Sequence, residues 1–397
     1  MAEDIEKIAE IALEAIEKEN ASNPEIHKMM SIVKKFIQDH DVLCYGGTAI
    51  NNLLMKQHQF YDPERDIPDY DFFSETPQKH CVVLSNLLHK AGIKNVEAKP
   101  GLHLGTFKVF ADFIGVADIS SLEKPVFNKL WKESVIKDGI HYVPPDFLRM
   151  SMYLELSRPS GDVSRWKKVY KRLQLLNSEY PVICPNRIKD ESESRIEIED
   201  ILIKEKVVLL GFNASSIQQK KVEWEYPLDL LVIPEKAHSV ATEIAKLFKN
   251  GHVKTRSYEE YAELLPAHYD ITDGSNLLVR IYETNACHSY HELPSGLLVG
   301  SIPTLLNFFF AMLYADNEFL EHTSRQRILC TSQKLIEIAN NSSQRKFKLW
   351  TPITCIGHQK DLIEMKQEKS ELYTKLSKNK KSREFLKYFF SYTPTRS

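Results

Sequence analysis

The chain has 397 residues, which is too long for one ordinary domain and predicts two or three. Hydrophobic residues make up 43% and charged residues 27%, so the composition excludes a disordered tail and provides for sizeable cores. The 52 lysines and arginines nearly cancel the 54 aspartates and glutamates, which excludes a uniformly basic coat for nucleic acid. A balanced total still allows a basic groove beside an acidic site, because a partner responds to local clusters of charge.

Residues 1–40 are expected to form two amphipathic helices, with Asn23 as a cap and Pro24 in the first turn of the second. Their acidic start lacks the basic and apolar parts of a signal peptide, so we expect no export. The apolar stretch 297–315 is interrupted by Ser301, Pro303 and Asn307. We interpret it as a core helix and expect no membrane contact.

Cysteine usage points to a reducing compartment. The six cysteines are widely spaced and include no C-x-x-C pair and no Cys/His group at zinc-ligand spacing. They are Cys44, Cys81, Cys184, Cys287, Cys330 and Cys355. We therefore expect them to be buried free thiols.

A glycine turn comes after the first predicted strand, Val42–Tyr45, and precedes a helix that starts near Ala49. Gly46 and Gly47 allow the backbone to approach a phosphate closely, and the adjoining helix offers free N–H groups at its positive end. Thr48 adds a hydroxyl donor. Such a turn alone is more often only a turn, so its interpretation depends on the acidic residues further along the chain.

Two acids come next at i and i+2 on a predicted strand, Asp69 and Asp71, so both side chains point to one face. Two carboxylates this close repel each other unless a cation such as Mg²⁺ lies between them. A third carboxylate on an adjacent strand would complete a two-metal site. Asp112 and Asp118 are the candidates, in a predicted strand–turn–strand unit. We favour Asp118, because Asp112 precedes the expected turn, where Asp commonly caps its own backbone.

The second half of the chain is expected to repeat this plan in degenerate form. Gly211 follows the stretch 201–210, Asp229 lies on a predicted strand over 228–232, and 277–283 takes the place of the later strand. Asp229 has no partner acid at i+2, so we expect no metal site there. The alternative is two unrelated α/β units.

The order of these elements resembles the nucleotidyltransferase superfamily. The runs 44–54, 66–74, 107–110 and 116–120 further resemble the poly(A) polymerase catalytic subunits of large nucleocytoplasmic DNA viruses, including poxviruses and giant viruses. The later segments 152–159, 164–170, 281–283 and 286–290 are similar to this family too. The gap between Thr48 and Asp69 is longer than in generic members of the superfamily and matches this viral branch.

The resemblance implies an α+β fold, with a polymerase-β-like catalytic domain at 41–185 and a degenerate nucleotidyltransferase-like domain with C-terminal helices at 186–397, after the N-terminal helices at 1–40. It implies that Gly46, Gly47 and Thr48 hold the triphosphate of ATP. Asp69, Asp71 and Asp118 would be the catalytic residues and would hold two Mg²⁺ or Mn²⁺ ions. The implied reaction is template-independent addition of adenylate to the 3′ end of viral mRNA.

The same resemblance implies a homodimer and a location in the host cytoplasm, the viral factory or the virion. A basic segment is the predicted contact for single-stranded RNA or nucleotide. Its residues are Arg158, Arg165, Trp166, Lys167, Lys168, Lys171 and Arg172. A second basic segment covers 366–387, with eight basic residues against three acidic ones. The alternative for both is an ordinary solvated helix face.

Two other functions stay open at the level of sequence. One is a different template-independent transferase that adds U or CCA, since no pattern in the chain reveals the choice of base. The other is a non-catalytic RNA-binding subunit, against which the three mutually repelling acids argue.

Overall fold

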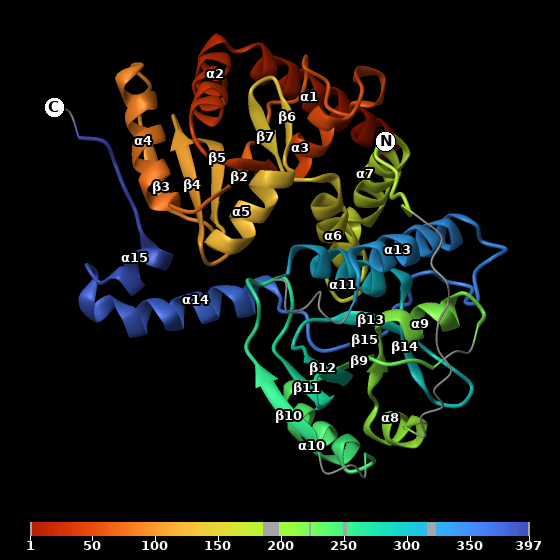
Figure 1. Ribbon diagram of the computed structural model, residues 1–397. Coiled ribbons are helices and arrows are strands. Elements are labelled where there is room, and N and C mark those ends of the chain that lie inside the picture. The colour runs from red at the N-terminus through yellow and green to blue at the C-terminus, as the bar shows by residue number, and fades with distance from the viewer. Residues whose placement is uncertain (1, 186–197, 222–223, 249–251, 316–322, 396–397) are drawn as a thin grey trace. The chain divides into compact units, whose positions relative to one another are not determined.

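The computed structural model describes residues 2–185, 198–221, 224–248, 252–315 and 323–395 (Figure 1). The chain divides into two compact units, one formed by Met1–Pro144 with Leu362–Ser397 and the other by Pro145–Asp361. This division differs from the predicted boundaries, because residues 145–185 join the second unit and the C-terminal helices join the first. The predicted boundary at 186 itself lies outside the described residues.

The first unit contains a seven-stranded mixed sheet in the order β3-β4-β5-β2-β1-β7-β6. Its strands are β1 Leu43–Tyr45, β2 Asp71–Ser74, β3 Glu97–Pro100, β4 Thr106–Ala111, β5 Ile114–Ser121, β6 Val135–Lys137 and β7 Ile140–Tyr142. Strand β2 pairs antiparallel with β1 and parallel with β5, while β4 pairs antiparallel with β5. The predicted strand–turn–strand unit around Asp112 is thus confirmed.

Helices of the first unit pack against this sheet and against one another. They are α1 Ala2–Ser22, α2 Pro24–Asp39, α3 Gly46–Leu53, α4 Pro77–Lys90 and α5 Lys124–Glu133. Asn23 caps α2 by accepting from the Glu25 N–H, as the sequence predicts. Phe36 of α2 contacts Phe72 of β2, with 5.9 Å between ring centroids. Because side chains alternate along a strand, Asp71 points to the opposite face.

The C-terminal helices α14 Leu362–Leu376 and α15 Arg383–Phe389 belong to the first unit, where Gln78 of α4 donates to the Leu386 carbonyl of α15. Tyr392 exchanges two backbone hydrogen bonds with Ala98 of β3, over 2.8 and 3.0 Å. Its hydroxyl also donates to Asn86 Oδ1 on α4. The end of the chain therefore extends the edge of the first sheet, which a linear scan of the sequence does not reveal.

The second unit contains an eight-stranded sheet in the order β10-β11-β12-β9-β8-β14-β13-β15. Its strands are β8 Val208–Leu209, β9 Leu228–Val232, β10 Val253–Tyr258, β11 His268–Asp273, β12 Asn276–Glu283, β13 His288–Glu292, β14 Leu298–Gly300 and β15 Cys355–Ile356. Its helices are α6 Pro145–Leu156, α7 Trp166–Glu179, α8 Glu199–Glu205, α9 Gly211–Gln218, α10 Pro234–Ala245, α11 Ile302–Tyr314 and α13 Arg325–Asn340.

The two sheets share one topology, strand for strand, from β3 to β6 in the first and from β10 to β13 in the second. The shared pairings include the parallel pairs β2–β5 and β9–β12. A register shift follows Val109 in the first sheet and Ile271 at the matching place in the second. The predicted α+β fold and the predicted repeat of one plan in two units are confirmed.

Helix α11 is buried along its whole length, which confirms the interpretation of 297–315 as core. Its Asn307 donates to the Met150 carbonyl of α6 over 3.2 Å. Among the helices that the structure describes, none is long and apolar enough to cross a membrane.

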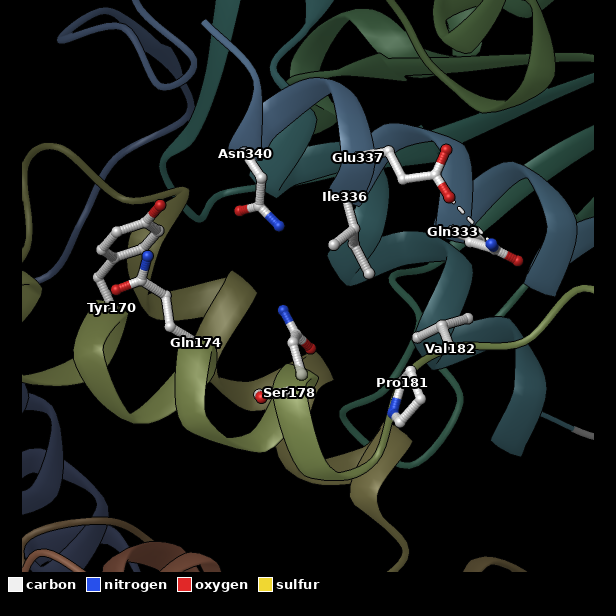
Figure 2. Close-up of a pocket in the computed structure, with 10 residues that line it drawn as sticks. Tyr170, Gln174, Ser178, Pro181, Val182, Gln333, Ile336, Glu337 and Asn340 are labelled. Carbon is white, nitrogen blue, oxygen red and sulfur yellow. Dashed lines mark hydrogen bonds between the residues drawn. The ribbon is translucent and has the colours of Figure 1, made fainter. Parts of the chain in front are cut away.

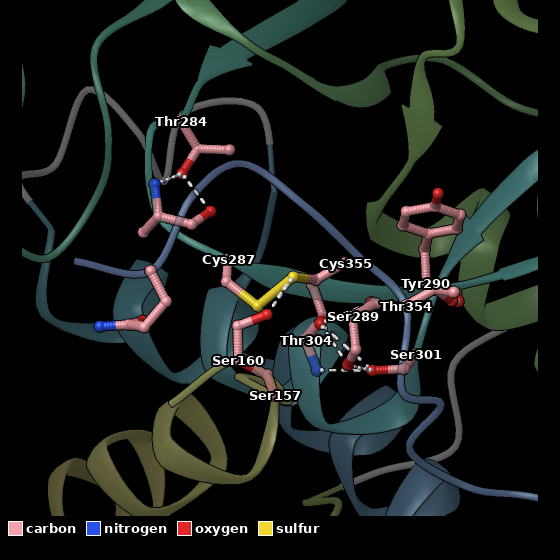
Figure 3. The surroundings of a disulfide bond; sticks show 12 residues. Ser157, Ser160, Thr284, Cys287, Ser289, Tyr290, Ser301, Thr304, Thr354 and Cys355 are labelled. Carbon is pink, nitrogen blue, oxygen red and sulfur yellow. Dashed lines mark hydrogen bonds between the residues drawn. A yellow bond between two sulfur atoms is a disulfide. The ribbon is translucent and has the colours of Figure 1, made fainter. Parts of the chain in front are cut away.

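The prediction of six free thiols is wrong for four of them. One disulfide joins Cys184 to Cys330, and Figure 3 shows the other, between Cys287 and Cys355, while Cys44 and Cys81 are free and buried. The paired cysteines are 146 and 68 residues apart, so only the fold brings them together. For the second pair the cause is the antiparallel pairing of β13 with β15.

Candidate active site

Asp71 and Asp118 lie side by side on the open face of the first sheet. They are direct Cα partners across the parallel strands β2 and β5. Their neighbours Phe72 and Ile119 are fully buried on the opposite, helix-covered face. The alternation of the two strands therefore brings both carboxylates to one place, as predicted for Asp118.

Asp69 lies just before β2, since the strand begins at Asp71 rather than at Asp69. Its backbone is held from two sides. The Thr48 hydroxyl donates to the Asp69 carbonyl over 2.6 Å, and the Asp118 N–H donates to the Tyr70 carbonyl over 2.9 Å. Thr48 thus ties the glycine turn to the acidic motif, and its hydroxyl proton is used there rather than offered to a phosphate.

Gly46 is required at the start of α3 for two reasons. Its φ of 73° is in the left-handed region, and a Cβ at this position would collide with Asp71 Oδ2. The absence of a side chain therefore lets the first turn of α3 and its free N–H groups approach the acids. Gly47 follows in the same turn.

The three acids interact electrostatically. Burial raises the pKa of Asp71, and so do the negative charges of Asp69 and Asp118; against the opposing effect of Lys108, the pKa reaches about 7. Tyr45 lies in the same site, where burial and the charge of Asp71 raise the pKa of its phenol. Its hydroxyl hydrogen-bonds Ser120 Oγ over 2.8 Å, and its ring stacks on Phe73.

Asp112 does not belong to this cluster. It occupies the turn between β4 and β5 with a φ of 48°, and its carboxylate accepts from Asn95. In the loop that leads to Asp69, Asp66 accepts from the Asp62 N–H, and Arg65 pairs with Glu17 of α1. Asp66 and Arg65 thus have hydrogen-bonding partners outside the cluster of three aspartates.

The donor set fits a hard divalent cation, because Asp69, Asp71 and Asp118 supply carboxylate oxygens, the ligands that Mg²⁺ prefers, and interact with one another electrostatically. Within the described part of the chain, however, no group of three or more acidic, histidine or cysteine side chains is already arranged around a metal position. At Asp118, Oδ2 accepts instead from Lys108 Nζ over 2.5 Å.

The equivalent place in the second unit carries a different set of charges. Gly211, with a φ of 61°, and Asp229 reproduce the Gly46–Asp71 contact. The strand partner of Asp229 is Arg280 instead of an acid. Arg280 donates to both carboxylate oxygens of Asp270, over 2.8 and 2.7 Å.

Comparison with known proteins agrees with this geometry. Residues 31–162 match the sequence profile of a family described as poly(A) polymerase catalytic subunit. The predicted resemblance is confirmed. The matched segment contains Gly46, Thr48 and all three aspartates.

Curated relatives of this segment come from large DNA viruses. The chain is 30% identical over 216 residues to a protein of Acanthamoeba polyphaga mimivirus that is provisionally named poly(A) polymerase catalytic subunit. It is 30% identical over 172 residues to a protein of African swine fever virus with the same provisional name. These alignments cover 52% and 42% of the chain, and the chain spans only 36% of the length of either relative.

One solved structure shares the fold over almost the whole chain. The crystal structure of the Megavirus polyadenylate synthase aligns with a TM-score of 0.80 at 20% sequence identity. The alignment covers 99% of this chain and 84% of that one. Both units of the chain therefore have counterparts in one known fold.

The predicted RNA-contact segment lies in the second unit, apart in sequence from the glycine turn and the three aspartates. Arg165 pairs with Glu155 over 3.1 Å, and Trp166 Nε1 donates to the Glu155 carbonyl. Burial lowers the pKa of the Arg158 guanidinium, which is largely withdrawn from solvent. The exposed members are Arg165, Lys167, Lys168 and Lys171, and Arg172 is half-buried. Only the exposed residues present charge to a partner.

A cavity of about 400 Å³ lies between α7 and α13 of the second unit (Figure 2). Figure 2 shows Tyr170 and Gln174 on one wall and Ile336 and Asn340 on the other. Gln333 donates to the Glu337 carboxylate at its edge. The lining is mainly amide and apolar with Glu337 as its single acid, so it lacks the cluster of acids that metal-dependent chemistry requires.

Proposed function

We propose that this protein is a poly(A) polymerase that adds adenylates from ATP to the 3′ end of single-stranded RNA without a template. The observation that carries the proposal is the pairing of Asp71 with Asp118 beneath the glycine turn of Gly46. The match of residues 31–162 to the poly(A) polymerase profile supports it.

The residues have separate tasks in this reaction. Gly46, Gly47 and the free N–H groups of α3 would receive the triphosphate, because a helix N-terminus favours anions. Thr48 fixes Asp69 relative to that turn through its 2.6 Å hydrogen bond. Asp69, Asp71 and Asp118 would hold the divalent cations.

Two bound Mg²⁺ or Mn²⁺ ions would supply charge stabilisation for the attacking 3′-oxygen and the leaving pyrophosphate. The protein contributes position: Asp71 and Asp118 face one point because their strands pair in register. No residue here needs to form a covalent intermediate, since phosphoryl transfer depends mainly on alignment and charge.

RNA would be held by the exposed basic side chains of the segment around α7, which are Arg165, Lys167, Lys168 and Lys171. The proposed partners are thus the RNA 3′ end and ATP. A homodimer and a location in the cytoplasm, viral factory or virion remain proposals that derive from the viral relatives.

The second candidate function is uridylyl transfer, which the same three aspartates and glycine turn would serve. The test is incubation of the protein with a short oligo(A) primer, Mg²⁺ or Mn²⁺, and each nucleoside triphosphate separately. Extension with ATP alone supports poly(A) addition. Extension with UTP in preference to ATP would replace it with uridylyl transfer, and no extension with any nucleotide would refute catalysis.

A further inference from the structure

Lys108 projects from β4 onto the face of the sheet that carries the three aspartates. It is the direct strand partner of Asp118, and its Nζ lies 2.5 Å from Asp118 Oδ2. The Lys108 side chain keeps 44% of its surface exposed, against 21% for Asp118. One of the three carboxylates thus already has a cation that comes from the protein, in a contact that solvent can reach.

The second unit has the matching pair with the charges exchanged. Asp270 takes the place of Lys108 and Arg280 the place of Asp118, because both pairs occupy the same register of the same strands. Arg280 also has Asp229, the counterpart of Asp71, as its partner on the other side. In both units, therefore, an aspartate equivalent to Asp71 lies beside a cross-strand ion pair.

The two pairs differ in how firmly the cation is held. The Arg280 guanidinium makes two hydrogen bonds to Asp270, and both side chains are only 7% exposed. Lysine offers a point charge on a flexible stem, whereas arginine offers a fixed fork that matches a carboxylate. The Lys108 ammonium can therefore leave Asp118 at low cost, while the Arg280 guanidinium is a permanent part of its sheet.

We propose that Lys108 is a positioning residue that neutralises Asp118 until a divalent cation binds, and that it must release Asp118 before the cation is held. The proposal rests on the proposed role of the three aspartates as metal ligands. It explains how the acids stay together without a metal ion, since an unpaired Asp118 would repel Asp71.

Competition of this kind has a signature that a general electrostatic effect lacks. Removing the lysine in Lys108→Met removes the competitor and strengthens metal binding. Lys108→Arg keeps the charge but grips the carboxylate more firmly, as Arg280 does, and weakens metal binding. If Lys108 acted only through its electrostatic field, the Lys108→Arg variant would bind the metal as tightly as the wild type, because the charge is the same.

The test is calorimetric titration of the full chain with Mn²⁺ alone, without nucleotide or RNA. We expect Lys108→Met to bind about two- to fivefold more tightly and Lys108→Arg to bind weaker by about the same factor, the range of a partly exposed ion pair. Lys99→Met is the matched control, because Lys99 is the strand partner of Lys108 but pairs with Glu97. Its affinity should stay close to that of the wild type.

Two results would overturn the role of Lys108 alone. Unchanged affinity in Lys108→Arg, or equal affinity in Lys108→Met and the wild type, would show that Lys108 does not compete. The wild type should bind Mn²⁺ and Asp118→Asn should bind it much more weakly. Absence of binding by the wild type would overturn the proposed metal-dependent function and the role of Lys108 together, whereas the first two results overturn the role of Lys108 alone.

Discussion

Arg280 occupies, in the second sheet, the strand position that Asp118 occupies in the first. Each is the parallel partner of an aspartate that lies against a left-handed glycine, Asp229 for Arg280 and Asp71 for Asp118. In the first sheet the paired acids need a metal cation between them. In the second sheet the Arg280 guanidinium itself supplies the positive charge beside Asp229. The second unit thus keeps the fold and loses the proposed chemistry.

Replacing Arg280 by methionine should destabilise the second unit. The change leaves Asp270 buried without its bidentate partner, and loss of one member of a buried pair costs about 3–5 kcal/mol. Urea unfolding measures this loss. The double variant Asp270→Leu with Arg280→Met should lose less, because it also removes the acid that Arg280 holds, so that only Asp229 loses a neighbouring positive charge. Equal losses in the single and double variants would contradict this explanation.

Gly46→Ala should greatly reduce nucleotide transfer. The new Cβ would collide with Asp71 Oδ2, and the left-handed φ of 73° costs a further ~1–2 kcal/mol of stability for an L residue. Gly92→Ala is the matched control, since Gly92 has a φ of 86° but nothing within 4 Å of an added Cβ. It should lose similar stability and keep its activity. Equal activity of both variants in primer extension would rule out the close contact as a requirement.

Binding of Mn²⁺ should strengthen as the pH rises from 6 to 8. Burial raises the pKa of Asp71 to about 7 from its ordinary value of 3.8, and a metal ion needs the ionised carboxylate. In the metal-free protein the same shift makes stability fall as the pH climbs from 3.8 to 7, because the unfolded chain ionises first.

Titration calorimetry at several pH values checks this dependence. Asp112→Asn should keep it, since Asp112 lies in the turn between β4 and β5. Asp71→Asn should bind weakly at every pH. An affinity for Mn²⁺ that is constant from pH 6 to 8 in the wild type would disprove the assignment of the titrating group.

Peptide mapping without reductant should find Cys184 joined to Cys330 and Cys287 joined to Cys355. Alkylation of the unfolded, unreduced protein should label only Cys44 and Cys81. Reduction should lower the free energy of unfolding by about 4–5 kcal/mol for each bond, the value for loops of this length. Labelling of all six cysteines without reductant would contradict these pairings.

Much of the site could be predicted because its signals are local. Gly46 and Gly47 precede a helix, Asp71 begins a strand, and the choice of Asp118 over Asp112 rested on turn chemistry. Each of these features depends on residues within a few positions in the sequence. The repeat of the plan around Gly211 and Asp229 was predictable for the same reason.

The features that the sequence did not reveal depend on pairing across the fold. Lys108 meets Asp118 only through the register of β4 on β5, which a bulge after Val109 alters further along. Similarly, Cys287 meets Cys355 through a two-residue strand, and Tyr392 reaches Ala98 from the far end of the chain. Spacing alone cannot specify such contacts, because they bring together residues that are distant in the sequence.

The most direct test of the proposed function compares the wild type with Asp71→Asn in one primer-extension assay with oligo(A), ATP and Mg²⁺. We predict a lengthening tail with the wild type and a rate at least ~100-fold lower with the variant, since the cation-holding carboxylate contributes several kcal/mol to the transition state. Both proteins should bind labelled oligo(A) equally. Tailing by Asp71→Asn at the wild-type rate would contradict the central claim.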